Sequence, residues 1–403
     1  MSTLTHTRPQ AEPAARLLSV PLAITFLAEF TSLTSFFLLL SVMPMLAAAA
    51  GAGSSGAGLI TGSLLLGTVA AEATATIAIR RFGYRLVIAA GAVLLGAPAL
   101  ALIPREPQAV MVAVSFVRGT GFGWCGVATG ALAATLLPAD RRGEGLGLLG
   151  IVSGVPAIVA LPAGVWLAGH HLAAAAAATA AVTALLPLAA IRWLPSGRGT
   201  QPGHGTGPER RMPGRSRNWL AGGTLRLPLI FAAATIAAGV LDSFLPLVRE
   251  IPTSLCSAAL LVQSVVATLS RWQAGRLGDR HGHTRLLIPA LAVAALGMAA
   301  MLLLSSPVVF FAGVVLFGAG FGALESATLA LMIEQLPEAK ASALWNLAYD
   351  AGYGAGPAVF GLFCVRTGYP AAFALTGTLI LAVLPAARRE RKSQPVRPNP
   401  TGH

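Results

Sequence analysis

Charge is what this chain lacks most. Of its 403 residues, 11% are charged and 55% are hydrophobic, whereas a soluble globular protein carries about 25% charged residues. A large core in a soluble protein would not explain so low a fraction of charged residues. We therefore expect most of the chain to lie in lipid.

Cysteine and the common catalytic motifs are also scarce. The three cysteines, Cys125, Cys256 and Cys364, occur singly in or at the ends of apolar segments, so neither a metal site nor a disulfide framework is indicated. The phosphate-binding motif G-x-x-x-x-G-K-[ST] is missing, which argues against ATP as the energy source. No Ser-His-Asp arrangement is indicated either. We expect no enzyme, no cofactor and no metal.

Long apolar stretches fill the chain instead. Each has at least about 18 residues, which as a helix is enough to cross the ~30 Å of hydrocarbon in a bilayer. They predict an all-α membrane protein with twelve transmembrane helices. The approximate spans are 17–47, 56–79, 84–104, 107–137, 144–168, 172–194, 226–248, 253–275, 284–305, 308–336, 341–365 and 369–387.

The net charge of +13 is distributed unevenly along the chain. If the N-terminus lies in the cytoplasm, 24 of the 28 basic residues fall in cytoplasmic segments, including the group from Arg271 to Arg285. The outer loops hold only Arg105, Arg249 and Arg366. The positive-inside rule therefore predicts cytoplasmic N- and C-termini, and it explains the charge without nucleic-acid binding.

The chain repeats itself at an offset of 199 residues. "GTGFGWCGVATGALAATLLP" (119–138) aligns with "GAGFGALESATLALMIEQLP" (318–337), and "RRFG" (80–83) aligns with "DRHG" (279–282) at the same offset. Two matches at one offset predict two parallel six-helix repeats. Parallel repeats of this kind place a substrate path between the halves, which rock to expose it alternately to each side.

The repeat divides the chain into four predicted parts. Residues 1–195 form the N-terminal half and residues 226–388 the C-terminal half, with a cytoplasmic tail at 389–403. Between the halves, residues 196–225 are rich in Gly, Pro and Arg and show no helical period, which indicates a cytoplasmic linker. The linker can be a tether near anionic lipid headgroups, or it can have a regulatory or partner-binding role.

The loop between predicted helices 8 and 9, "GRLGDRHGHTR", resembles the loop signature of the major facilitator superfamily, G-x-L-x-D-R-x-G-R-K. The resemblance implies the major facilitator fold, and it implies that Asp279 and Arg280 latch neighbouring helices on the cytoplasmic side. A loop that is merely solvated is the alternative. The first half has Arg80 where Asp279 stands, so its latch must differ. The matching residues and the nearby arginine are Gly275, Leu277, Asp279, Arg280, Gly282 and Arg285.

Two more segments resemble motifs of the same family. "FVRGTGFG" in predicted helix 4 resembles its arginine motif and places Arg118 inside the bilayer. "GIVSGVPAIVALPAG" in predicted helix 5 resembles the Gly/Pro motif of antiporter members. Gly and Pro are also common in spanning helices as close-packing points and kinks, so the antiporter implication stays open. The helix-5 positions are Gly154, Pro156, Pro162 and Gly164.

Charged residues inside the spans are the candidate functional residues. A carboxylate at the bilayer centre costs about 2.5–3.5 kcal/mol on insertion scales, so such residues are rare unless they have a function or a partner. One arginine cannot neutralise five carboxylates, so some of them must bind protons or face a cation. We single out Glu29, Glu72, Arg118, Asp242, Glu325 and Asp350, together with Asn346 on the polar face of Asp350.

Two interpretations of these acids remain open. In the first they are neutral or hydrogen-bonded to a nearby helix and only help packing, an alternative that stays open for Asp242, Glu72, Asp350 and Glu325. In the second they couple proton movement to transport. For Glu29 and Arg118 the second is favoured, because an acid in helix 1 with an arginine in helix 4 resembles proton-coupled drug antiporters of the superfamily.

The sequence therefore predicts a secondary active transporter. We expect proton-coupled efflux of a small organic molecule by alternating access, from a monomer in the plasma (inner) membrane of a bacterium. The expected partners are this substrate, protons and the lipid bilayer. Proton-coupled uptake of a metabolite is the main alternative, and a non-transporting membrane receptor or scaffold is the second.

Overall fold

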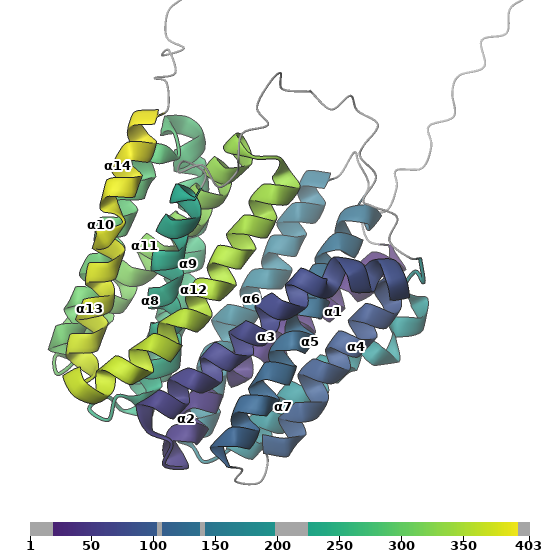
Figure 1. Ribbon diagram of the computed structural model, residues 1–403, viewed down its shortest axis with the longest axis horizontal. Coiled ribbons are helices and arrows are strands. Elements are labelled where there is room, and N and C mark those ends of the chain that lie inside the picture. Colours follow the sequence, from purple (N-terminus) through teal and green to yellow (C-terminus); the bar gives the residue numbers. More distant parts are fainter. Residues whose placement is uncertain (1–18, 103–106, 138–141, 198–224, 394–403) are drawn as a thin grey trace, which may run out of the picture.

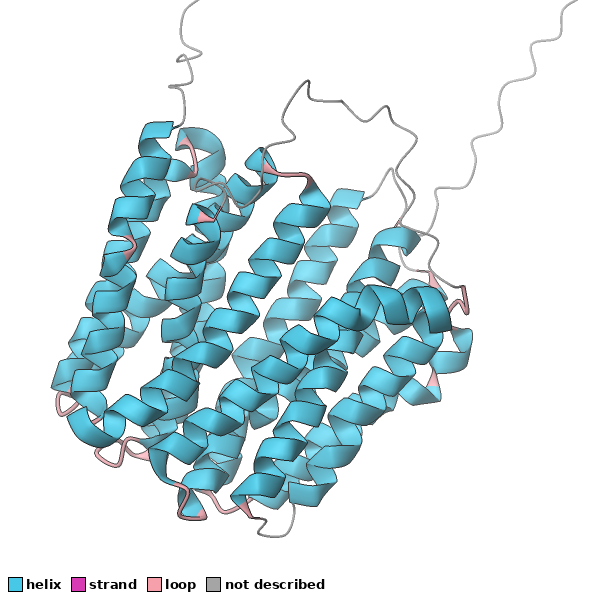
Figure 2. Cartoon of the chain, viewed as in Figure 1, coloured by secondary structure: helices cyan, strands magenta, loops and turns pink. Residues whose placement is uncertain are grey.

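The computed structural model describes residues 19–102, 107–137, 142–197 and 225–393. Within these ranges the chain is helical, and the connections are short loops and turns (Figure 2). Fourteen α-helices and several short 3₁₀ turns are present in this part of the chain. The prediction of an all-α protein is confirmed.

The helices follow the predicted spans closely. Their bounds are α1 Val20–Leu40, α2 Val42–Ala49, α3 Gly53–Phe82, α4 Tyr84–Gly96, α5 Gln108–Leu136, α6 Arg142–Gly169, α7 Ala173–Leu185, α8 Arg226–Phe244, α9 Thr253–His281, α10 Thr284–Ala300, α11 Pro307–Gln335, α12 Glu338–Thr367, α13 Tyr369–Ala382 and α14 Leu384–Ser393. Two predicted spans are each built from two helices, α1 with α2 and α13 with α14. The twelve predicted spans thus account for all fourteen helices.

Ten helical segments of the described residues are long and apolar enough to cross a membrane. The two remaining spans are α7, whose apolar segment is short, and α12, which carries polar side chains such as Asn346 and Asp350 along its length. Large hydrophobic side chains are exposed on the surface, for example Leu66 at 62%, Leu296 at 58% and Leu362 at 60%. Such a surface suits lipid, so the chain is a multi-pass membrane protein.

The internal repeat is visible in the helices themselves. The bounds of α5 and α11 differ by the same 199 residues as the repeated sequence. Both α3 and α9 are followed by a glycine with a positive φ, 82° at Gly83 and 90° at Gly282. Only glycine adopts this conformation without strain, and so each half makes the same sharp turn into its next helix.

Close packing of helices repeats as well. A Cβ atom on Gly119 of α5 would collide with the backbone of Leu64 in α3. In the other half a Cβ on Gly318 of α11 would lie 2.8 Å from the carbonyl oxygen of Gln263 in α9. Both pairs are related by the offset of 199. The repeated glycines therefore let the backbones of neighbouring helices approach closely, as small residues do in membranes.

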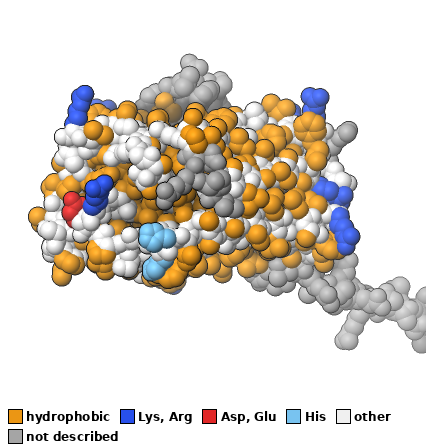
Figure 3. Space-filling model, turned by 90° about the horizontal axis from the view of Figure 1, so that it is seen from below, with side chains coloured by type: hydrophobic (Ala, Val, Ile, Leu, Met, Phe, Trp, Pro, Cys, Tyr) orange, Lys and Arg blue, Asp and Glu red, His pale blue; other side chains and the backbone are white. Residues whose placement is uncertain are grey.

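The two halves meet along two seams, one between α3 and α12 and one between α6 and α9 (Figure 1). We call the end of the bundle that holds residues 19, 197, 225 and 393 the linker end, and the opposite end the far end. Figure 3 views the far end, which is largely hydrophobic with few charged side chains. Five hydrogen bonds between the halves lie in the far-end part of the bundle: Ser41–Asp242, Ser54–Tyr369, Ser55–Gly361, Thr61–Ser243 and Ser257–Pro162.

Candidate functional site

Glu29 of α1 accepts a hydrogen bond from the hydroxyl of Thr129 in α5. Thr25 and Ser32, which share its face of α1, are both buried. Counting at about 1.5 Å per residue places Glu29 roughly 30 Å from the far end, so it is nearer the linker end than the middle of its span. The sequence placed Glu29 on a polar face, but it did not reveal Thr129 as the hydrogen-bond donor.

Arg118 of α5 is only 2% exposed, and its guanidinium donates to two backbone carbonyls. The acceptors are the oxygens of Leu95 in α4, at 2.7 Å, and of Ser35 in α1, at 3.0 Å. Arg118 and Thr129 are separated by about 16 Å along α5 at the ordinary helical rise. Arg118 therefore joins three helices of the N-terminal half, and it is not in contact with the Glu29 carboxylate.

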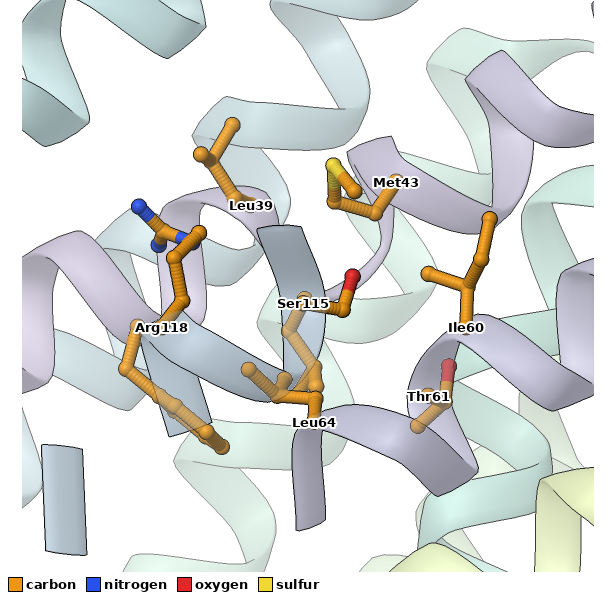
Figure 4. Close-up of a pocket in the computed structure, with 9 residues that line it drawn as sticks. Leu39, Met43, Ile60, Thr61, Leu64, Ser115 and Arg118 are labelled. Carbon is orange, nitrogen blue, oxygen red and sulfur yellow. The ribbon is translucent and has the colours of Figure 1, made fainter. Parts of the chain in front are cut away.

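A small cavity lies beside Arg118 (Figure 4). Its volume is about 10 Å³, which is the space of roughly one water molecule. The conformation described here thus has no room for an organic substrate at this position. The lining side chains come from α1, α2, α3 and α5 and are Phe36, Leu39, Leu40, Met43, Ile60, Thr61, Leu64, Ser115 and Arg118.

Asp242, near the end of α8, lies where the two halves meet. It is 5% exposed, and one carboxyl oxygen accepts a hydrogen bond from the hydroxyl of Tyr353 in α12. Its other carboxyl oxygen, Oδ1, is buried and has no hydrogen-bond partner. The hydroxyl of Ser41 in the N-terminal half donates to its backbone oxygen. A buried oxygen without a donor is costly, so this carboxyl group suits protonation or a ligand that supplies a donor.

Glu325 of α11 forms an ion pair with Arg271 of α9, with 3.8 Å between the charged atoms. Arg271 has half of its side chain exposed, whereas the Glu325 side chain is 11% exposed. By sequence alone, Arg271 belongs to a cytoplasmic segment and Arg118 is the one cation for five acids. That count was wrong for Glu325, because the long α9 brings Arg271 to the level of this acid.

Glu72 of α3 and Asp350 of α12 lie within hydrogen-bonding distance of each other, across the seam between the halves. Asp350 is 8% exposed, and Asn346, one turn earlier in α12, is exposed. Tyr349 lies within electrostatic reach of Asp350. The sequence selected both acids, but it could not show that they form a pair.

Aromatic rings follow the same helix. The ring centroids of Trp345 and Tyr349 are 5.7 Å apart, and those of Tyr349 and Tyr353 are 5.5 Å apart. Phe231 of α8 stacks on Trp345 with 4.5 Å between centroids. The spacing of four residues puts the α12 rings on one helix face. We call the row of Trp345, Tyr349 and Tyr353 the aromatic ladder. It ends at Asp242, because the hydroxyl of Tyr353 donates a hydrogen bond to the carboxyl group of Asp242.

In the loop that resembles the family signature, the Asp279 side chain is 77% exposed and lies 3.7 Å from His283. The ring of His283 is also 3.8 Å from Glu334 of α11. His283 thus connects the end of α9 to a neighbouring helix, a contact that the sequence did not reveal. A Cβ on Gly275 would lie 3.4 Å from the Ser326 hydroxyl of α11. The side chains of Arg280 and Arg285 are exposed at the same end. A gating role for this loop stays a prediction.

The fifth predicted span corresponds to α6, and its four Gly and Pro motif positions have different surroundings there. Pro156 and Pro162 lie inside the helix, and the carbonyl of Pro162 accepts a hydrogen bond from Ser257 of α9 in the other half. A Cβ on Gly164 would collide with the backbone of Leu38, whereas Gly154 faces open space. Close packing thus explains Gly164, and Pro162 contributes to the seam.

Comparison with known proteins adds an independent finding. The sequence model of the Major Facilitator Superfamily matches residues 25–339 and 229–403 of this chain. Among curated protein sequences, a search finds no match.

Solved structures share the fold. A bacterial homolog of the human lysosomal transporter Spinster, in an inward-facing and occupied conformation, has a TM-score of 0.75 at 13% identity over 93% of this chain and 96% of that chain. A D-xylose-proton symporter gives 0.73 at 15% identity, covering 91% and 96%. The inward-open xylose transporter XylE from E. coli gives 0.70 at 17% identity, covering 90% and 95%.

Proposed function

Since the chain belongs to the Major Facilitator Superfamily, and is thus a secondary transporter rather than an enzyme, we propose that it exports a small organic molecule in exchange for protons. The halves of such a transporter expose a path between them alternately to each side. We propose three properties of this transporter: its coupling to protons, its direction of transport and its class of substrate.

One observation carries the proposal of proton coupling. Among the described residues, no basic side chain lies within 4 Å of the carboxyl groups of Glu29, Glu72, Asp242 or Asp350. The guanidinium of Arg118 donates hydrogen bonds to two backbone carbonyls, and Arg271 pairs with Glu325. Four acids within a membrane bundle without a cation favour neutralisation by protons or by a positively charged substrate.

The substrate class follows from the aromatic ladder and from Asp242. Flat rings at Trp345, Tyr349 and Tyr353 favour an apolar or aromatic body. A cationic group of that body would be attracted both to the ring faces and to the unpartnered oxygen of Asp242. We propose a cationic or zwitterionic amphipathic compound as the substrate, with a neutral amphipathic one as the alternative.

Flux in proteoliposomes with an imposed pH gradient tests the function. The probes are a panel of fluorescent cationic, zwitterionic and neutral amphipathic compounds. We expect at least one cationic probe to accumulate in vesicles with an acidic lumen, because protons that leave through an antiporter drive the probe inward. Accumulation only with an acidic exterior would instead indicate proton-coupled uptake. Fluxes that ignore the gradient for every transported probe would contradict proton coupling.

The orientation is part of the proposal. The distribution of the basic residues favours a cytoplasmic linker end, and we propose that the membrane is a bacterial plasma membrane. Both termini and the linker would then be cytoplasmic, around the halves 1–195 and 226–388 with the linker 196–225 between them. A reporter that fluoresces only in the cytoplasm should be active when fused to the C-terminus or inserted in the linker. A periplasmic alkaline phosphatase that is active at either position would contradict this orientation.

A further inference from the structure

The seam between α3 and α12 is tight at the far end. The two helices run antiparallel, and a Cβ on Gly58 of α3 would collide with the backbone of Pro357 in α12. A Cβ on Gly354 of α12 would meet the side chain of Leu65 in α3 at 2.5 Å. Further toward the linker end in the same seam, Glu72 of α3 lies beside Asp350 of α12.

This pair consists of two acids alone. A hydrogen bond between two carboxyl groups needs a proton on one of them, because an ionised carboxylate has no hydrogen to donate. If both ionise, two negative charges meet in a place poor in water and repel each other. A proton on one of the two carboxyl groups would therefore stabilise the contact between Glu72 and Asp350.

In the part of the chain that the structure describes, no basic side chain lies within 4 Å of either carboxyl group of the pair. Tyr349 of α12 has electrostatic contact with Asp350, and the same tyrosine is within reach of Glu325 of α11, Asp242 of α8 and Arg271 of α9. Arg271 is 3.8 Å from Glu325, and the two side chains form an ion pair. From α5, the neutral indole of Trp124 donates a hydrogen bond to the hydroxyl of Thr74 in α3 at 3.2 Å.

We propose that Glu72 and Asp350 form a single proton-binding site that exists only when the two halves meet at this level of the seam. The proton lies between one carboxyl group from each half, so the site binds a proton when the seam closes. When the proton is released, α3 and α12 separate toward the linker end. The proposal deepens the proposed proton-coupled function, because it names a place where proton binding and the movement of the halves are one event.

The direct test measures the distance across the seam. Ile77 of α3 and Leu347 of α12 both lie on the linker side of the acid pair, and their side chains are 57% and 44% exposed. Cysteines at these two positions carry spin labels in the full-length chain in lipid nanodiscs. The native cysteines Cys125, Cys256 and Cys364 are buried and stay in place. We expect the label distance to be short at about pH 5 and to lengthen by several ångström toward about pH 9, since the second carboxyl group ionises.

Variants separate the shared proton from simple packing. In Glu72→Gln the amide donates to Asp350 at every pH, so the short distance should persist without pH dependence. In Glu72→Ala the pair is lost, and the long distance should prevail at every pH. The control Glu250→Gln makes the same chemical change at an exposed acid of the far end and should keep the parent curve.

Other outcomes overturn the proposal. A pH response that survives in Glu72→Gln would place the responsible group elsewhere, and a distance that ignores pH in the parent would show that the pair is not a switch. Shortening of the distance by sodium chloride at about pH 9, but not by potassium chloride, would make the pair a sodium site instead. The measurement needs neither substrate nor gradient, so it can fail while proton-coupled flux is found, and the reverse.

Discussion

Glu29→Gln is expected to lower transport driven by a pH gradient by about tenfold or more, because the amide keeps the size of the side chain but cannot carry a proton. The variant should insert normally, since it removes the cost of an ionisable group inside the membrane. Its amide oxygen can still accept the hydrogen bond that Thr129 donates to Glu29. The measurement is the flux of one transported probe against pH, in proteoliposomes of wild type and variant.

The controls isolate the proton from the hydrogen bond. Thr129→Val removes the hydroxyl donor but leaves the carboxyl group, so it should shift the pH profile while gradient-driven accumulation survives. Exchange of labelled for unlabelled probe without a gradient should persist in Glu29→Gln, because no net proton movement is then required. If wild type and Glu29→Gln show the same rate and the same pH profile, Glu29 is a packing residue. The coupling site would then have to be sought among the other interior acids.

Arg118→Ala is expected to abolish most transport and to lower the melting temperature of the purified protein. The buried guanidinium holds the carbonyls of Leu95 and Ser35, and its removal leaves both without this donor. Each unsatisfied buried group costs about 1–3 kcal/mol, partly offset because the buried charge is also removed. The expected loss is therefore about 2 kcal/mol in stability, together with about tenfold or more in flux, as α1, α4 and α5 no longer move as one body.

Arg118→Lys is the matched comparison, because it keeps the charge but replaces the planar guanidinium by a single ammonium group. It cannot span both carbonyls with the same geometry, so it should recover part of the stability and part of the flux. A wild-type melting temperature and flux in Arg118→Ala would show that the two hydrogen bonds matter little. If Arg118→Lys is as defective as Arg118→Ala, the planar geometry of the guanidinium is the essential property.

The sequence alone was enough for the architecture because lipid and close packing leave few choices. Every backbone polar group inside a bilayer must be satisfied within the protein, so long apolar runs become helices, and twelve runs predicted the helical spans that the structure contains. The repeat was equally readable. Positions 119 and 318 need glycine because another backbone lies against each of them. The two glycines therefore recur in the sequence at the offset of 199 residues.

The partners of the charged residues were a different matter. The sequence selected Glu29, Glu72, Asp242 and Asp350 as interior acids, since a charge in an apolar run is conspicuous wherever it points. Which group each one meets depends on helix rotation, tilt and level, and these are set by packing between segments far apart in the chain. A hydrophobic run carries almost no information about them.

Arg118 and Arg271 illustrate the limit. Both arginines are visible in the sequence, yet only the folded bundle decided that Arg118 binds two carbonyls and that Arg271 reaches Glu325. The meeting of Glu72 with Asp350 likewise joins α3 to α12, one helix from each half. The sequence by itself thus determined the helices, their repeat and the presence of interior acids. The tertiary structure alone decided the pairing of those acids, because hydrogen bonds and ion pairs act over a few ångström and need both partners in place.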